Sequence, residues 1–214
     1  MESKIIEYIK VEYDPEIILL GGSRAKGKET EKSDWDLFLL GSKKGKEGFV
    51  EFEGQRLDVT FKNWPEEGKP LAIPSGPLWP LKILFDGSGS RLANILNKTE
   101  EYFNQGPLTL YREAVLSRSD KLDSWKRKIE KYANSPIVEF WYAGVFYEFA
   151  IRNWFELQDR WSLAPAEALP IIQEEDISFY NLLASFVSAI SIERPKFTRD
   201  IFNALETRRS EALK

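Results

Sequence analysis

Residues 16–40 carry the sequence EIILLGGSRAKGKETEKSDWDLFLL, in which two short apolar runs flank a polar connector. The first run ends at Gly21-Gly22, and the second follows directly after Asp34 and Asp36. Apolar runs of this length, bounded by glycine and polar residues, are typical of buried strands. The stretch therefore predicts a strand, a tight glycine turn that leads into a helix, and a second strand that carries two carboxylates.

The spacing of three aspartates suggests a metal site. Asp34 and Asp36 are two residues apart, so on an extended chain they project to the same face. Asp58 lies within a second alternating strand pattern. Two carboxylates on one strand and a third on another can bracket a pair of divalent ions roughly 3.5–4 Å apart. We expect the three to converge at the C-terminal side of the strands near residues 16–20 and 35–40.

The residue types available to bind a metal are restricted. The chain has no cysteine and no histidine, so thiolate chemistry, histidine bases and histidine metal ligands are all excluded. Any metal must be held by oxygen, which favours Mg²⁺, Mn²⁺ or Ca²⁺ over zinc.

The glycine turn and the aspartates together form a signature. Glycine lets backbone approach a ligand closely, and amides at a helix start can donate to a phosphate. The order Gly22-Ser23-Arg24-Ala25-Lys26-Gly27, then Ser33-Asp34-Trp35-Asp36, then Asp58 resembles that of the DNA polymerase β-like nucleotidyltransferase superfamily. The similarity is closest to its minimal and kanamycin nucleotidyltransferase-like branches. Lys26 replaces the usual arginine of the turn, which keeps the charge but loses bidentate geometry.

The resemblance implies roles for individual residues. Asp34, Asp36 and Asp58 would be the catalytic metal ligands, with Mg²⁺ or Mn²⁺ as cofactor and ATP as the expected donor of AMP. The residues implied in nucleotide binding are Gly22, Ser23, Arg24 and Lys26. Several relatives take a base from the helical half, and the acidic candidates there are Glu113, Glu130, Glu139 and Glu148. We place Glu148 and Glu139 first, although an ordinary surface or helix-pairing glutamate is the simpler interpretation of each.

The periodicity changes near residue 99 and predicts two domains in an α+β fold. Residues 1–98 should form a nucleotidyltransferase domain, a mixed sheet with flanking helices, and residues 99–214 a helical, substrate-binding bundle. In the first domain we expect helices at residues 3–10 and 91–97, a hairpin turning at 53–55, an irregular crossing over 64–80 and a last strand at 81–86. In the second we expect helices near residues 107–118, 120–133, 137–160, 176–191 and 195–213.

Composition limits the compartment and the partners. The chain is 43% hydrophobic and 30% charged, which is typical of a globular protein. No apolar run is long enough to cross a membrane, and the start lacks a signal-peptide pattern, so we expect a cytoplasmic protein. The net charge is −4 and neither half has more basic than acidic residues. This balance disfavours nucleic acid as a partner.

The resemblance, together with the charge balance, implies a metal-dependent nucleotidyltransferase that moves AMP from ATP onto a hydroxyl of a small molecule, such as an aminoglycoside-like antibiotic. The alternative is an antitoxin-type enzyme that nucleotidylates or binds a partner protein. We also keep a homodimer as an alternative. The helical half cannot itself be the ribonuclease toxin of such a pair, because that motif needs histidine. A non-catalytic scaffold is disfavoured by the three intact aspartates.

Overall fold

The computed structural model describes residues 1–42, 44–71, 80–89 and 91–214, and the chain divides into two units. The first unit spans Met1–Asn104 and the second Gln105–Lys214. The helix α3 (Arg91–Asn104) continues seven residues past its predicted end at residue 97, so the boundary predicted after residue 98 falls inside this helix. Part of the predicted crossing at residues 64–80 lies outside the described residues.

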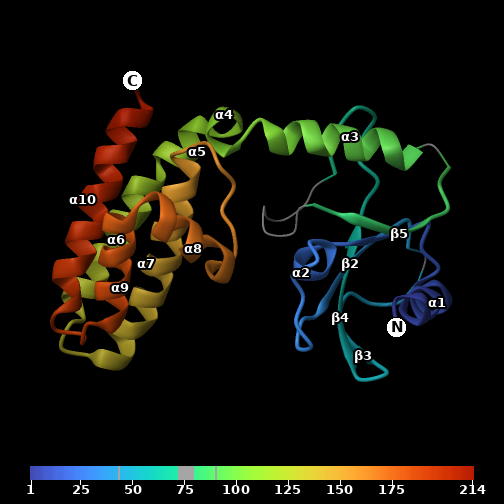
Figure 1. The fold of residues 1–214 in the computed structure, drawn as a ribbon, viewed down its shortest axis with the longest axis horizontal. Coiled ribbons are helices and arrows are strands. Elements are labelled where there is room, and N and C mark those ends of the chain that lie inside the picture. Colours follow the sequence, from blue (N-terminus) through green and yellow to red (C-terminus); the bar gives the residue numbers. More distant parts are fainter. Residues whose placement is uncertain (43, 72–79, 90) are drawn as a thin grey trace. The chain divides into compact units, whose positions relative to one another are not determined.

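The first unit is built on one five-stranded sheet in the order β3-β4-β2-β1-β5 (Figure 1). Its strands are β1 (Ile17–Leu20), β2 (Trp35–Leu40), β3 (Gly48–Phe52), β4 (Gln55–Lys62) and β5 (Lys82–Asp86). The β2–β4 pair is parallel, whereas β1–β2, β1–β5 and β3–β4 are antiparallel. The sheet is therefore mixed, as the sequence predicts.

Each face of the sheet has its own apolar core. The helix α1 (Glu2–Tyr13) contributes Ile5 and Ile9 to one core, together with Leu37 of β2. On the other face, Leu92 of α3 joins a core that contains Phe38 of β2. All four residues of β1 are buried. A strand covered on both faces must be apolar throughout, which explains the uninterrupted runs in β1 and β2.

A two-residue turn joins β3 to β4. Glu53 has φ of 45° and Gly54 has φ of 74°. Two successive positive φ values match the right-handed twist of the flanking strands, and glycine adopts this conformation without steric cost. The Glu53 carboxylate also accepts two hydrogen bonds from Lys4 Nζ, at 3.0 and 2.7 Å. The predicted hairpin is confirmed.

The second unit is helical (Figure 1). Its helices are α4 (Pro107–Leu110), α5 (Arg112–Leu116), α6 (Arg118–Lys131), α7 (Pro136–Glu156), α8 (Pro165–Glu175), α9 (Ile177–Ser188) and α10 (Arg194–Ala212). The long aromatic helix α7 supplies Phe146, Ala150 and Trp154 to the core. The predicted α+β class, with a mixed sheet followed by helices, is confirmed.

Two helical predictions need correction. The helix expected at 107–118 is interrupted at Tyr111, whose φ of −134° and ψ of 39° are not helical, so α4 and α5 are separate. The helix α8 was not expected, because Pro165 and Pro170 are helix breakers in most positions. Pro165 occupies the first turn, where no donor is lost. Burial of Ala168 and Ile172 holds α8 in place despite Pro170.

Among the residues with a described conformation, none of the helices is both long enough and apolar enough to cross a membrane.

Candidate active site

The glycine turn after β1 is closely fitted to Asp36. Gly22 begins the short helix α2 (Gly22–Ala25) with φ of +66°, a conformation that favours glycine. The backbone N–H of Gly21 donates to the carbonyl of Asp36 at 2.8 Å. A Cβ on Gly22 would overlap Oδ2 of the Asp36 carboxylate. The sequence therefore needs glycine at position 22 both for the backbone and for the space that Asp36 occupies.

Strand register brings two of the three aspartates together. In the parallel β2–β4 pair, Asp36 lies opposite Asp58. Side chains opposite one another in neighbouring strands share a face, and Phe38, two residues along, belongs to the core beneath α3. Asp36 and Asp58 thus project from the α3 side of the sheet. The long-range pairing of β2 with β4 produces this juxtaposition, which neither strand could produce alone.

The position of the aspartates along the strands differs from the prediction. The strands β1 and β2 are antiparallel, so no edge of the sheet can be the C-terminal side of both. The aspartates lie beside the C-terminal end of β1 but at the N-terminal end of β2. The prediction was wrong for β2 because local sequence does not specify strand direction.

Negative charge accumulates around Asp36. Burial raises the pKa of the Asp36 carboxyl above its ordinary value, and the nearby charges of Asp58 and then Asp34 raise it further. Each effect penalises the ionised form, the second because like charges repel. A divalent cation bound between these groups would relieve the repulsion, so the chemistry of the donor set fits Mg²⁺ or Mn²⁺.

Asp34 interacts with an arginine of β4. Nε of Arg56 lies 3.8 Å from Oδ2 of Asp34. The Arg56 guanidinium also stacks 3.9 Å above the centre of the Phe49 ring. Within the residues that the structure describes, no group of three His, Cys, Asp or Glu side chains is placed to hold a metal ion. Asp36 and Asp58 therefore lie opposite each other, while Asp34 is next to the guanidinium of Arg56.

Arg24, which is predicted to bind nucleotide, stabilises the polar connector in this structure. Its guanidinium donates to the carbonyl of Ser33 at 2.8 Å and to that of Asp34 at 3.2 Å. It also lies 4.5 Å from the centre of the Trp35 ring. These contacts fix the chain just before β2 and so position Asp34 and Asp36. Ser23 and Lys26, the other polar candidates of the turn, are partly exposed.

Glu148 and Glu139, the two candidate bases placed first among the four, have different environments, although both lie on α7. Glu148 is exposed. Glu139 is fully buried and accepts a hydrogen bond from Arg194, which also donates to the carbonyls of Phe186 and Ala189. A carboxylate enclosed in this way needs its cation, because an unpaired buried charge is costly. The contacts of Glu139 fit a structural ion pair.

We expect Glu139→Gln to lower the free energy of unfolding by about 2–3 kcal/mol, because Arg194 would lose its charged partner in a buried site. Urea unfolding of the full chain measures this effect. The matched control is Glu148→Gln on the exposed side of the same helix, which should change stability by less than about 0.5 kcal/mol. Unchanged stability in Glu139→Gln, combined with lost turnover, would favour a catalytic role for Glu139.

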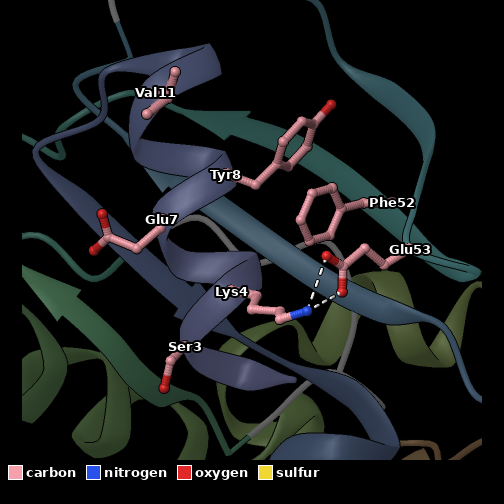
Figure 2. A pocket seen from close by; sticks show the side chains of 7 residues that line it. All are labelled: Ser3, Lys4, Glu7, Tyr8, Val11, Phe52 and Glu53. Carbon is pink, nitrogen blue, oxygen red and sulfur yellow. Dashed lines mark hydrogen bonds and ion pairs between the residues drawn. The ribbon is translucent and has the colours of Figure 1, made fainter.

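A surface groove of about 520 Å³ lies elsewhere on the first unit (Figure 2). It is formed by α1 and the β3–β4 hairpin, with Tyr8 stacked on Phe52 at 4.3 Å between ring centres. Figure 2 shows Lys4 bound to Glu53 beside these rings. Phe52 projects to the α1 side of the sheet. The groove is therefore on the face opposite Asp36 and Asp58 and is separate from the candidate active site.

Arg56 and Gln55 are the residues near the site to which the sequence analysis gave no role. The oxygen Oε1 of Gln55 accepts from Nε1 of Trp35 at 3.2 Å and so links β4 to the start of β2. The alternation of β4 places Arg56 on the same face as Asp58, a signal available from sequence. Its contact with Asp34 depends on the pairing of β2 with β4.

Comparison with known proteins identifies the segment that carries this geometry. Residues 3–63 match the family described as polymerase beta nucleotidyltransferase. The matched segment includes the glycine turn and all three aspartates. A comparison of the chain with curated proteins gave no match. The family match confirms the resemblance and places residues 3–63 in the polymerase β-like nucleotidyltransferase superfamily, whose general chemistry is nucleotidyl transfer.

Proposed function

We propose, from the premise that residues 3–63 form a polymerase β-like nucleotidyltransferase domain, that this protein transfers AMP from ATP to a hydroxyl group of a small molecule. The observation that carries the proposal is the register of β2 and β4, which sets Asp36 opposite Asp58 beside the glycine turn. We place the reaction in the cytoplasm, where ATP is available.

Three carboxylates would hold the metal. Asp36 and Asp58 would bind it between the paired strands, and Asp34 would complete the donor set after its side chain moves away from Arg56. Bound Mg²⁺ or Mn²⁺ would lower the pKa of the acceptor hydroxyl and neutralise charge that develops on the α-phosphate and the departing pyrophosphate. The donors are all oxygen, as these ions prefer.

The chain would also bind the nucleotide and move a proton. Ser23 and the amides after Gly22 would donate to the phosphates, with Lys26 as a nearby cation. Asp58 would accept the proton of the acceptor hydroxyl while a bond forms between that oxygen and the α-phosphorus. The bond from the α-phosphorus to the bridging oxygen breaks, and that oxygen leaves with pyrophosphate. Arg24 would act indirectly, by holding the connector that precedes β2.

We propose a small-molecule acceptor, including aminoglycoside-like antibiotics. The net charge of −4 would repel a phosphate backbone, and there is no excess of basic residues to bind one. Acidic side chains attract a cationic small molecule by the same electrostatics. Exposed Glu148 remains a candidate base for that acceptor.

A protein acceptor is the second candidate, and one surface favours it. Three large apolar side chains on α7 are exposed: Ile137 at 88%, Phe140 at 72% and Trp141 at 61%. Contiguous apolar surface of this kind is typical of protein interaction sites. A partner protein, or a second copy of this chain, would be nucleotidylated or bound through this surface.

The proposed function is tested by incubating the full-length protein with ATP and Mg²⁺ and measuring pyrophosphate release. The acceptors are a panel of aminoglycosides and lincosamides in one arm and cell lysate in another, and products are identified by mass spectrometry. We expect a small-molecule adduct of AMP, absent from the Asp58→Asn variant. Label on a protein band alone would favour the second candidate. Transfer to an RNA 3′ end would contradict the charge argument, and absence of any transfer would contradict the proposal.

A further inference from the structure

The aspartate face of the sheet carries a positive charge beside Asp34. Asp34 precedes Asp36 by two residues, and Arg56 precedes Asp58 by two, so the parallel register that pairs Asp36 with Asp58 also brings Arg56 beside Asp34. The contact is 3.8 Å between Arg56 Nε and Asp34 Oδ2, and both side chains are partly exposed. The same guanidinium is held over the Phe49 ring at 3.9 Å.

This placement makes Arg56 compete with a divalent cation for the Asp34 carboxylate. A guanidinium beside a carboxylate weakens the attraction of that carboxylate for a divalent cation, because it neutralises part of the negative charge and repels the arriving cation. Phe49 lies opposite Asp58 in the β3–β4 pair, so its ring is on the same face as the aspartates. Stacking on this ring keeps Arg56 near the site even when its contact with Asp34 is broken.

We infer that Arg56 is an internal counter-ion that occupies Asp34 in the metal-free protein and thereby lowers the affinity of the aspartate face for divalent cations. The inference rests on the proposed function, in which Asp34 is a metal ligand. Arg56 is thus a positioning residue. It limits metal loading in the absence of substrate and places a positive charge beside the site once it is displaced.

The test measures Mn²⁺ binding to the whole chain without nucleotide. Binding is monitored as the loss of the electron paramagnetic resonance signal of free Mn²⁺. We expect Arg56→Gln to tighten binding by about three- to tenfold, the range expected for loss of an exposed ion pair together with a nearby positive charge. Arg56→Lys keeps the charge and should stay within about twofold of the wild type.

The matched control is Lys62→Gln, which removes the same charge from the same strand. Lys62 is four residues beyond Asp58 on the same face, and its Nζ lies 5.7 Å from the centre of the Phe38 ring. Its charge is held over this ring and not at Asp34, so we expect a smaller gain in Mn²⁺ affinity than in Arg56→Gln.

Two outcomes would overturn the inference about Arg56 but leave the proposed function standing. One is unchanged or weaker Mn²⁺ binding in Arg56→Gln while Asp36→Asn loses binding. The other is an equal gain in Arg56→Gln and Lys62→Gln, which would indicate net charge rather than the Asp34 contact. If Asp36→Asn bound Mn²⁺ as tightly as the wild type, the proposed metal site would fail, and the inference with it.

Discussion

Asp36→Asn should reduce nucleotidyl transfer by at least about 1000-fold while leaving the protein as stable as the wild type or more so. The substitution removes a proposed charged ligand from the centre of the candidate site, where developing charge on the phosphates would be neutralised. Asparagine has nearly the same shape, so the packing against Gly22 is kept. Turnover is measured as pyrophosphate release with the acceptor found in the panel, and stability as the midpoint of thermal unfolding in EDTA.

The stability gain should depend on pH in a defined direction. Burial, Asp58 and Asp34 raise the pKa of Asp36 in the folded protein above the ordinary value of 3.8. The folded state therefore binds this proton more tightly, and the free energy of unfolding falls as pH rises from 3.8 through the raised pKa. Asparagine cannot ionise, so its advantage should be present at pH 7 and vanish below about pH 4.

Solvent screening limits how much Asp36→Asn can raise the free energy of unfolding. Asp36 is only partly buried, so screening keeps the gain below about 1 kcal/mol, or a rise of about 1–3 °C in the unfolding midpoint. A fall in the midpoint at pH 7 would show that Asp36 is bound by favourable contacts rather than surrounded by like charge. Retained turnover would show that Asp36 is not a metal ligand.

Gly22→Ala should abolish turnover and lower the free energy of unfolding by about 2–4 kcal/mol. Alanine is strained at φ of +66°, and its methyl group would overlap the Asp36 carboxylate. The carboxylate would have to move from its position beside Asp58, which separates two of the three proposed ligands. The loss in turnover should exceed about 100-fold, as measured by pyrophosphate release at saturating Mg²⁺.

Gly27→Ala provides the matched control for Gly22→Ala. Gly27 has φ of +65°, nearly the same as Gly22, but a Cβ there would meet no described atom within 4 Å. Its substitution should cost only the backbone strain, about 1–2 kcal/mol, and leave most of the activity. Equal effects of the two substitutions on turnover would contradict the role assigned to the contact between Gly22 and Asp36.

Local sequence determined much of the first unit. The apolar runs of β1 and β2 are uninterrupted because both faces of the sheet are covered, and this pattern is visible without a structure. The hairpin was predictable because glycine in a turn between two strand patterns supplies the positive φ that such turns require. The two-residue spacing of Asp34 and Asp36 determined that they share a face, since side chains alternate along any strand.

Strand pairing and helix packing were decided only by the tertiary structure. The parallel pairing of β2 with β4 sets Asp36 opposite Asp58 and Arg56 beside Asp34, and it depends on contacts between segments about twenty residues apart. Arg24 contacts the carbonyls of Ser33 and Asp34 because the connector folds back onto α2, a conformation that the residue types alone do not specify. Glu139 has an unremarkable sequence context, yet packing against α10 makes it a buried partner of Arg194. Residue type and local spacing determine which groups can do chemistry. Long-range packing decides which of them meet, because Asp58, Arg56 and Arg194 reach Asp36, Asp34 and Glu139 from other elements.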